Sequence, residues 1–385
     1  MEKVLEADLS TEFAGLRLAN PIIAASAGTT ETVERMARLE EAGVGAAVMK
    51  SLFEEEVCRQ APRPCFKVIR RGGSTTLYSY EQASVWGPER YAEEVSRARK
   101  ELKIPVIPSI NCKTEKGWSE YSRRMEDAGA SAIELNVSCP HGSISFRMGT
   151  AAPEAILRAV ETARAAVKLP LVVKLSGQFT NPPAIVAEVE RLGVEAVTLF
   201  NRFTGLEIDT EAERPAMHGG YAGHGGSWAL HFALRWISEI SPATRLDIAA
   251  SGGVQEADDV VKYLLVGATA VQVCSLLYTK GPQEAGNLVS GLADWMLKKG
   301  YARLGDFRGK VSGRAILGTA EVDRSQAGAF RVNPESCKRC GLCARVCIYG
   351  APKGSREKGY RIGPECMGCG LCAELCPAGA IFFQK

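Results

Sequence analysis

The sequence lacks the features that would place the chain in a membrane, in a secretory pathway or on a nucleic acid. No run of about 18 apolar residues occurs, and Met1 to Asp8 contain no apolar core of the kind that signal peptides carry. The charges nearly balance, with 47 Lys and Arg against 44 Asp and Glu and a formal net charge of +3. We therefore expect a cytoplasmic protein that binds neither a membrane nor a nucleic acid.

The sequence also lacks the glycine fingerprint of a dinucleotide-binding domain. Three glycine pairs match the first part of G-x-G-x-x-G but lack its third glycine, namely Gly43/Gly45, Gly223/Gly225 and Gly368/Gly370. The 385 residues, 46% of them hydrophobic, are nevertheless enough for one large core and a small second unit. We therefore do not expect this chain to bind NAD in the usual way.

Cysteine is abundant but unevenly distributed along the chain. Eight of the 13 cysteines lie between Cys337 and the C-terminus, and five are scattered, at Cys58, Cys65, Cys112, Cys139 and Cys274. A secreted disulfide scaffold would not follow a long stretch of ordinary globular sequence that has no signal peptide. Metal ligation in a reducing compartment explains the crowding better.

The eight C-terminal cysteines fall into two runs with the spacing of a two-cluster ferredoxin. In this pattern the first three cysteines of a run bind one [4Fe–4S] cluster and the fourth binds the other cluster. The runs are Cys337-x2-Cys340-x2-Cys343-x3-Cys347 and Cys366-x2-Cys369-x2-Cys372-x3-Cys376-Pro377. We therefore predict that electrons pass through two clusters. One is held by Cys337, Cys340, Cys343 and Cys376, and the other by Cys366, Cys369, Cys372 and Cys347.

Zinc is the alternative occupant of these cysteines, because paired C-x2-C motifs also bind zinc. Zinc sites need two close pairs, whereas this chain repeats a three-plus-one arrangement with matching interiors, GLCARVC and GLCAELCP. One departure from the ferredoxin pattern is Ile348, which follows Cys347 where proline is usual. This departure affects the local geometry and leaves the predicted ligands in place.

Between Asn20 and about Gly300, short apolar runs alternate with amphipathic helical stretches. Nearly continuous apolar strands that alternate with helices are typical of parallel strands buried on both faces. The strands are expected at 20–26, 46–52, 104–111, 132–139, 169–176, 196–202, 245–253 and 270–278. The helices are expected at 30–42, 118–127, 153–168, 182–192, 228–240 and 257–265.

Eight such strands favour a closed (β/α)8 barrel, and an open doubly wound sheet is the structural alternative. The predicted fold class is therefore α/β, a TIM barrel followed by a small α+β two-cluster ferredoxin domain. We expect the barrel over residues 1–305, a linker over 306–330 and the ferredoxin domain over 331–385.

Polar residues gather where the expected strands end. Barrel enzymes collect their chemistry at the C-terminal ends of the strands, and they bind phosphate after strands seven and eight. The residues at these positions are Lys50, Asn111, Asn136 to Cys139, Lys174, Asn201, Arg202, Ser251 to Gly253, Cys274 and Ser275. Taken singly, a lysine there can be a solvated cap, and Gly252-Gly253 can be a simple turn. Together they favour a cofactor that carries a phosphate.

The segment ELNVSCPHG, residues 134–142, resembles a known family. It is similar to the flavin domains of dihydropyrimidine dehydrogenase and class 1A dihydroorotate dehydrogenase, FMN barrels with NLSCP at this place. Gly15-Leu-x-Leu-x-Asn-Pro21, the strands of Lys50 and Lys174, ASGGV and VQVCS match in the same order. With the cysteine runs included, the resemblance is to the FMN and iron–sulfur subunits of bacterial NAD-dependent dihydropyrimidine dehydrogenases.

The resemblance implies an FMN site at the C-terminal end of the barrel. Lys174 would lie beside the N1–C2=O edge of the flavin, where a fixed cation stabilises the charge of the reduced ring. The residues expected to contact the cofactor are Ala25, Ser26, Lys50, Ser51, Asn111, Lys174, Gly226, Gly252, Gly253, Cys274 and Ser275.

The resemblance also implies that Cys139 is the general acid or base. Flavin N5 gives hydride to one carbon of an activated C=C bond, and Cys139 gives a proton to the neighbouring carbon. A thiol suits this role because its pKa lies near the working range and can be tuned. Without the motif, Cys139 would be read as a buried structural thiol. We expect it on a loop, 139–149, that closes over the substrate.

The residues implied to contact the substrate are Ser79, Asn136, Ser138, Asn201 and Arg202, and two of them depart from the family pattern. Dihydropyrimidine dehydrogenases carry an asparagine near Ser79 and a threonine at Arg202. Arginine pairs well with carboxylates, so the substrate can carry a carboxylate rather than being uracil or thymine. In the alternative, Arg202 turns outward and pairs with Glu207 or Asp209.

The expected reaction is therefore reduction or formation of the C=C bond of a cyclic amide such as uracil or thymine. Because clusters carry single electrons and this bond needs two, FMN would convert between the two modes. A partner subunit with FAD and NAD(P)H sites, or a soluble ferredoxin, would supply the electrons. We expect a homodimer or heterotetramer. A pure electron carrier with a merely structural barrel is the remaining alternative.

Overall fold

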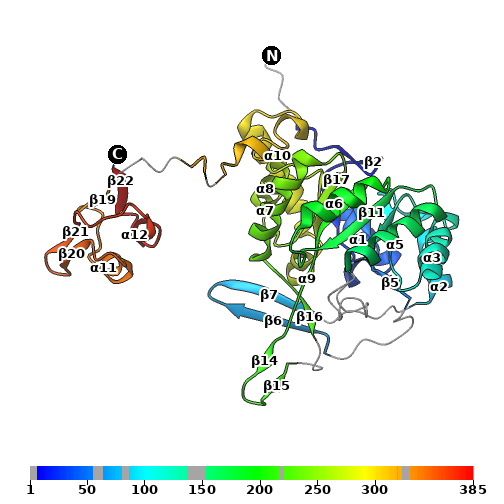
Figure 1. Ribbon diagram of the computed structural model, residues 1–385, viewed down its shortest axis with the longest axis horizontal. Coiled ribbons are helices and arrows are strands. Elements are labelled where there is room, and N and C mark those ends of the chain that lie inside the picture. The colour runs from blue at the N-terminus through cyan, green and yellow to red at the C-terminus, as the bar shows by residue number, and fades with distance from the viewer. Residues whose placement is uncertain are drawn as a thin grey trace. The chain divides into compact units, whose positions relative to one another are not determined.

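The computed structural model describes residues 7–54, 64–79, 86–137, 152–216, 221–318, 320–322 and 329–384. The chain divides into two compact units, Met1–Ile316 and Leu317–Lys385. Figure 1 shows the helices and strands of both units. Within the described ranges, no helix combines the length and the apolar character needed to cross a membrane.

The first unit is a closed barrel of parallel strands. Each strand pairs in parallel with the next one, and the last strand pairs with the first, which closes the ring. The strands are β3 (Ile22–Ala24), β4 (Ala46–Val48), β8 with β9 (Val106–Ile107 and Ser109–Asn111), β10 (Ile133–Leu135), β11 (Leu171–Ser176), β12 (Ala196–Asn201), β17 (Asp247–Ser251) and β18 (Ala270–Val273). This arrangement confirms the predicted barrel.

The last predicted strand is wrong at its end. It was expected to continue to residue 278, but β18 stops at Val273 and helix α9 (Ser275–Lys280) follows. The buried side of this short helix carries Leu276 and Leu277. Part of the apolar run VCSLLY is therefore helical. The prediction failed here because the periodicity of a short buried segment does not distinguish a strand from a helix.

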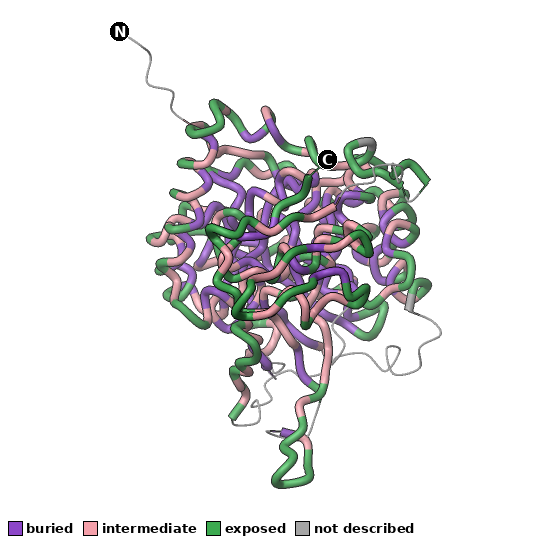
Figure 2. Tube along the Cα trace, turned by 90° about the vertical axis from the view of Figure 1, so that its left-hand side faces the viewer, coloured by how far each residue is buried: buried purple, intermediate pink, exposed green. Residues whose placement is uncertain are grey.

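Helices surround the barrel, and six of them match the predicted ones. Their buried faces pack against the outward-facing side chains of the strands in one large core, drawn as the purple interior of Figure 2. The helices are α1 (Val33–Glu41), α2 (Pro88–Glu101), α3 (Glu115–Asp127), α5 (Ala152–Ala166), α6 (Pro182–Arg191), α7 (Ala229–Ile240), α8 (Ala257–Leu265) and α10 (Glu284–Lys299). The helices α2 and α10 were not predicted, and α2 buries only a narrow stripe of an otherwise charged segment.

Helix starts follow the ordinary capping rules. Thr32 caps α1 by accepting from the backbone N–H of Arg35, and Thr114 caps α3 in the same way. Asn181 caps α6, whose first residue is Pro182. These caps fix the loops at the C-terminal ends of the strands, because each of these helices begins there.

A short hairpin closes the N-terminal end of the barrel. Strands β1 (Thr11–Phe13) and β2 (Leu16–Leu18) are joined by Ala14 and Gly15, both with positive φ. Phe13 and Leu18 are fully buried against small inward-facing side chains of the strands, mostly alanines. This end of the barrel is therefore an apolar plug.

A four-stranded antiparallel sheet stands at the opposite end. It is formed by β13 (Phe203–Gly205), β16 (Ala222–Gly226), β7 (Ser74–Ser79) and β6 (Phe66–Arg71), in that order. A smaller hairpin, β14 (Ile208–Asp209) with β15 (Arg214–Pro215), follows β13. These strands come from segments after the second and sixth barrel strands, far apart in sequence but side by side in Figure 1. No pattern in the sequence predicts this sheet.

The second unit is small and built around the cysteine runs. Strands β19 (Ala329–Val332) and β22 (Ile381–Gln384) pair, as do β20 (Pro352–Ser355) and β21 (Gly359–Ile362). Each cysteine run leads into a short helix, α11 (Leu342–Val346) or α12 (Leu371–Glu374). Both helices begin after a glycine with positive φ, at Gly341 and Gly370, which explains the repeated GLC sequence.

Candidate active site

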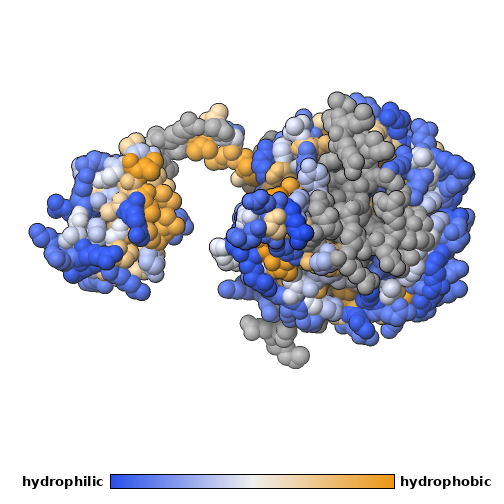
Figure 3. Space-filling view, turned by 90° about the horizontal axis from the view of Figure 1, so that it is seen from below, coloured by the Kyte–Doolittle hydropathy of each residue, from blue (hydrophilic) through white to orange (hydrophobic). Residues whose placement is uncertain are grey.

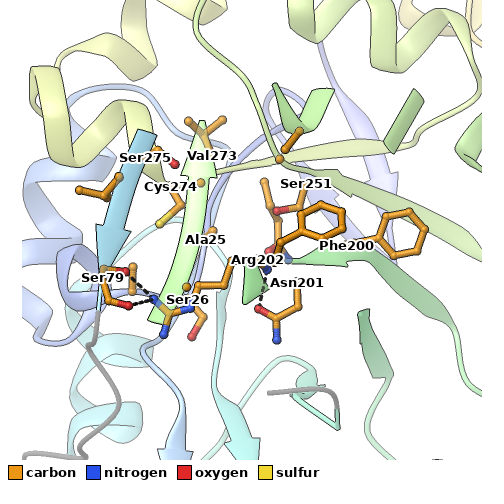
Figure 4. A pocket seen from close by; sticks show the side chains of 18 of the residues that line it. Ala25, Ser26, Ser79, Phe200, Asn201, Arg202, Ser251, Val273, Cys274 and Ser275 are labelled. Carbon is orange, nitrogen blue, oxygen red and sulfur yellow. Dashed lines mark hydrogen bonds between the residues drawn. The ribbon is translucent and has the colours of Figure 1, made fainter. Parts of the chain in front are cut away.

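A pocket opens at the C-terminal end of the barrel strands (Figure 4). It encloses about 1150 Å³ of empty space, part of which is open to solvent. Its walls come from the strand ends and from the antiparallel sheet. The predicted site residues that line it are Ala25, Ser26, Lys50, Ser51, Ser79, Asn136, Lys174, Asn201, Arg202, Gly252, Gly253, Cys274 and Ser275.

Two predicted cofactor residues do not line this pocket. Asn111 is buried, and its Nδ2 donates to the backbone oxygen of Asn136 at 2.6 Å, so it supports a pocket residue. A Cβ on Gly226 would lie 2.6 Å from the backbone oxygen of Thr75, so the close approach of two strands requires glycine there. Ser138 and Cys139 lie outside the described residues, and their roles stay predictions.

One end of the pocket is bare backbone. Gly252 and Gly253 follow β17 with φ values of 120° and 77°, and a Cβ on Gly253 would lie 2.4 Å from the backbone nitrogen of Leu230. Cys274 and Ser275 follow the next strand, β18, and line the same end. Backbone N–H groups after strands seven and eight are the usual phosphate site of such barrels, so these residues fit the phosphate end of FMN.

Two lysines line the interior part of the pocket. Lys50 is 8% exposed and Lys174 is 5% exposed, so both ammonium groups are held in largely water-free surroundings. Apolar side chains such as Ala25, Phe200 and Val273 line the pocket beside them. A flat ring that gains negative charge on reduction fits between apolar walls and a fixed cation.

The pocket floor rests on a buried carboxylate that the sequence analysis missed. Glu134 is fully buried on β10 and accepts hydrogen bonds from Gln272 Nε2 at 2.9 Å and Ser109 Oγ at 3.0 Å. Thr198 Oγ1 lies 3.3 Å and Lys174 Nζ 3.5 Å from its oxygens. Its signal was in the sequence, because Glu134 and Asn136 alternate with two apolar residues and therefore point to the same side of the strand.

Asparagine side chains form a hydrogen-bonded row beside this floor. Asn136 Nδ2 donates to Ser51 Oγ at 3.0 Å, and Asn201 Nδ2 donates to Asn136 Oδ1 at 3.0 Å. The backbone N–H of Arg202 donates to Asn201 Oδ1 at 2.9 Å. These bonds fix the orientation of both amides, which are groups able to recognise a planar cyclic amide.

Ser79 and Arg202, the two departures from the family pattern, contact each other. Arg202 Nη1 donates to Ser79 Oγ at 2.6 Å and to the Ser79 backbone oxygen at 3.4 Å (Figure 4). A Cβ on Gly223 would lie 2.1 Å from Arg202 Cδ, so the glycine makes room for this side chain. The outward orientation of Arg202 is not observed, and Glu207 pairs with Arg71 at 3.3 Å instead.

His224 lies next to this arginine in the pocket wall. Burial lowers the pKa of His224, and the nearby Arg202 guanidinium lowers it further, against the Ala222 carbonyl and Glu207. The imidazole is therefore neutral near pH 7 and adds no second positive charge. Arg202 forms no ion pair with a carboxylate of the described residues. Its hydrogen-bond partners there, Asn201 and Ser79, are neutral.

Cysteines of both runs lie together in the second unit. A cavity of about 360 Å³ is lined by Cys337, Cys340, Cys343, Cys372 and Cys376. Burial raises the pKa of the Cys372 thiol, and electrostatic interaction with the neighbouring Cys347, Cys366 and Cys369 raises it further. The fourth cysteine of each run thus lies with the first three of the other run. This crossed arrangement fits two [4Fe–4S] clusters.

Large apolar side chains are exposed on the second unit. Figure 3 shows apolar surface gathered on one face of this unit. Ile348 directly follows Cys347, and Met367 directly follows Cys366, so apolar surface adjoins the cysteine runs. The exposed residues are Ile348, Tyr349, Met367, Leu371, Leu375, Phe382 and Phe383. Exposed apolar patches of this kind mark contact surfaces.

Two family models match the chain. Residues 8–296 match the model described as dihydroorotate dehydrogenase, and residues 329–377 match the model described as 4Fe-4S dicluster domain. The first match covers the barrel and its pocket, and the second covers all eight cysteines of the C-terminal runs. The boundaries of the two matches agree with the two compact units.

Curated relatives are similar to the barrel alone or to both units. The catalytic subunit of dihydroorotate dehydrogenase B (NAD(+)) from Thermoplasma acidophilum is 30% identical over 305 residues, 79% of this chain and 98% of the relative. The corresponding subunit from Thermoplasma volcanium is 31% identical over 275 residues, 71% of this chain and 88% of the relative. The PreA subunit of NAD-dependent dihydropyrimidine dehydrogenase from Escherichia coli is 25% identical over 359 residues, 90% of this chain and 87% of the relative.

Proposed function

The chain belongs to the dihydroorotate dehydrogenase family, and we propose that it reduces or forms the activated C=C bond of a cyclic amide such as uracil or thymine. Membership in this family and the 4Fe-4S dicluster domain make it a flavin-dependent oxidoreductase with an iron–sulfur domain. The observation that carries the finer proposal is the hydrogen-bonded pair Asn136 and Asn201 in the pocket of Lys50 and Lys174.

We assign separate roles to residues of the pocket and to Cys139. When bound, FMN supplies the exchange between single electrons and a hydride pair. Gly252, Gly253 and Ser275 would hold its phosphate end, and Lys174 would stabilise negative charge at the ring. Asn136 and Asn201 orient the cyclic amide by hydrogen bonds. Cys139 Sγ then gives a proton to the carbon next to the one that receives hydride, or takes it in the reverse direction.

Electrons reach the barrel from outside this chain in our proposal. The second unit holds two clusters on the crossed cysteine sets, and its exposed apolar side chains, among them Ile348 and Met367, contact the electron donor. The relative from Escherichia coli is a subunit of an NAD-dependent enzyme. By analogy, the donor is a partner subunit with FAD and NAD(P)H sites, with a soluble ferredoxin as the other source. The assembly is then a homodimer or a heterotetramer.

The test is reoxidation of the reduced flavin by candidate substrates. The full chain, loaded with FMN and reduced without oxygen, is mixed with uracil or thymine, and the flavin absorbance is followed. We expect rapid reoxidation that falls about 10²–10⁴-fold in Cys139→Ala, because the proton donor is lost. Cys65→Ala is the matched control, since Cys65 lies outside the pocket lining. No reoxidation by any cyclic amide would sink the proposal.

A second candidate, a substrate that carries a carboxylate, is favoured by the contact between Arg202 and Ser79. This guanidinium lines the pocket with neutral partners, and carboxylates are its preferred ligands. Reoxidation by orotate would then exceed reoxidation by uracil, and Arg202→Gln would remove the difference. Arg71→Gln, an exposed arginine of the same sheet, is the control. Fast reoxidation by uracil in the wild-type protein would exclude this candidate.

A further inference from the structure

Glu134 is the buried charge for which the reaction proposed above has no use. Its side chain is fully buried inside the barrel, beneath the pocket that Lys174 lines. Replacing a buried ion pair by apolar residues is often neutral or stabilising, so stability alone does not account for a carboxylate and an ammonium here. The position of the pair, directly below the site, suggests a role in the site itself.

The hydrogen bonds around Glu134 show that it acts as a carboxylate. Four donor groups converge on its two oxygens: Gln272 Nε2 at 2.9 Å, Ser109 Oγ at 3.0 Å, Thr198 Oγ1 at 3.3 Å and Lys174 Nζ at 3.5 Å. An ionised carboxylate only accepts, so it can satisfy all four donors. A neutral amide in its place would bring two donors of its own and leave some of these groups without an acceptor.

The carboxylate also sets the direction of a chain of hydroxyl groups. Ser109 donates to Glu134, so Ser51, 2.8 Å away, must donate to Ser109. Ser26 lies 3.1 Å from Ser51 and must in turn donate to it. The protons of the chain therefore all point toward Glu134. Ser26, which lines the pocket, is left with its lone pairs free to accept.

We propose that Glu134 is the positioning residue of the flavin site, the fixed counter-charge that holds Lys174 at the pocket floor and sets the potential of the bound flavin. The inference rests on the flavin site of the proposed function. Lys174 Nζ also donates to Gln272 Oε1 at 3.4 Å, so the ammonium group is held by two side chains, Glu134 and Gln272. The negative charge of Glu134 partly offsets this cation, and the offset moderates how strongly the site favours the reduced ring.

The test is the two-electron midpoint potential of FMN in the full chain, with cluster absorbance subtracted by means of flavin-free protein. Glu134→Gln removes this counter-charge, so we expect the potential to rise by at least about 30 mV, a tenfold shift in the equilibrium. Asp247→Asn, at the opposite end of the barrel, is the matched control and should leave the potential unchanged. An unchanged or lower potential in Glu134→Gln overturns the inference.

A second pair of variants keeps the test valid if Glu134→Gln fails to fold. Lys174→Met removes the cation and should lower the potential, and the double variant Glu134→Gln/Lys174→Met should lie between Lys174→Met and the wild type. If Glu134→Gln alone does not unfold cooperatively, the double variant should regain cooperative thermal unfolding, because both charges of the ion pair are then removed together. Absence of that rescue also overturns the inference. Failure of the wild-type chain to bind FMN would instead contradict the proposed function.

Discussion

The two ends of the barrel are built from the same eight strands and are chemically opposite. At the N-terminal end, Phe13 and Leu18 plug a ring of small apolar side chains. At the C-terminal end, the strands finish in lysines, asparagines and glycines around a pocket. Each end also holds a carboxylate. Asp247 at the plug accepts from neutral donors, Ala14 N and Thr269 Oγ1, whereas Glu134 below the pocket meets a lysine.

The different partners of Asp247 and Glu134 show how a buried carboxylate can be assigned to the fold or to the site. Asp247 fastens the hairpin to the barrel, because its acceptors satisfy a backbone N–H group of the turn. Glu134 fastens no loop, and its partners are side chains of four other barrel strands. A carboxylate that satisfies backbone donors is explained by the fold. One that organises side chains below a pocket is explained by the site.

The strongest way to break the comparison is to open the plugged end. Phe13→Ala removes a fully buried ring and leaves a cavity in its place. We expect the unfolding free energy of the first unit to fall by about 3–5 kcal/mol. Denaturant unfolding measures the loss, with Leu16→Ala as a partly buried control that should cost less. FMN affinity of the folded fraction should stay the same. A tenfold weaker flavin site would show that the two ends are coupled.

The next largest effect is expected at the bare backbone of the open end. Gly253→Ala places a methyl group 2.4 Å from the nitrogen of Leu230, in a backbone with φ 77°. The loop must shift, so FMN affinity should fall by at least about tenfold, or roughly 1.4 kcal/mol, in fluorescence titrations.

Gly300→Ala is the control for this substitution. Its φ is 74°, but no atom lies within 4 Å of the added methyl group, so it carries the backbone strain without the collision. We expect FMN affinity to be unchanged in this variant. Equal losses in the two variants would show that the glycine is needed for backbone conformation in general and not for the phosphate end.

A smaller effect is expected in the wall of Arg202. Gly223→Ala would place a methyl group 2.1 Å from Arg202 Cδ, which forces the guanidinium away from Ser79. If Arg202 recognises a carboxylate, the preference for orotate over uracil should fall several-fold, or about 1 kcal/mol. Gly72→Ala, in the open turn of the same sheet, should not change it. An unchanged preference in Gly223→Ala would count against recognition by Arg202.

The sequence predicts the barrel well because its strands are short apolar runs that finish in polar residues. All eight predicted strands overlap strands of the barrel, although the last one ends earlier than predicted. The strand-end pattern and the family resemblance together named thirteen of the residues that line the pocket; Ala25, Ser26, Ser51 and Ser79 came from the resemblance alone. The crossed cysteine sets are equally predictable, since the spacing alone fixes which thiolates can meet. In both cases a local pattern carries the long-range arrangement.

What the sequence does not predict depends on pairing between distant segments. Strand β7 is mostly polar and β16 is rich in glycine, and neither shows an alternating pattern that predicts a strand. Each becomes a strand only because it pairs with the other. The contact of Arg202 with Ser79 depends on that sheet, and therefore the outward orientation of Arg202 was a reasonable alternative that proved wrong. Glu134 was missed because a lone carboxylate in an apolar strand has meaning only together with the lysine of the next strand.

The smallest expected effect concerns the pH dependence of the plugged end. Burial raises the pKa of Asp247 above its ordinary value of 3.8, although the Ala14 N–H and the Thr269 hydroxyl act against it. The folded chain then holds this proton more tightly than the unfolded chain. As the pH rises above about 4, the unfolded state loses its proton first, and stability falls until the folded pKa is passed. Asp247→Asn should abolish this fall, which we expect to be of the order of 1 kcal/mol or less because the group is only partly buried. Denaturant unfolding of both proteins across the acid range measures it.

The contrary result is a stability that rises from about pH 4 and rises more in the wild type than in Asp247→Asn. It would mean that the Asp247 carboxylate is stabilised at the plug. The contrast with Glu134 would then lie in the partners alone.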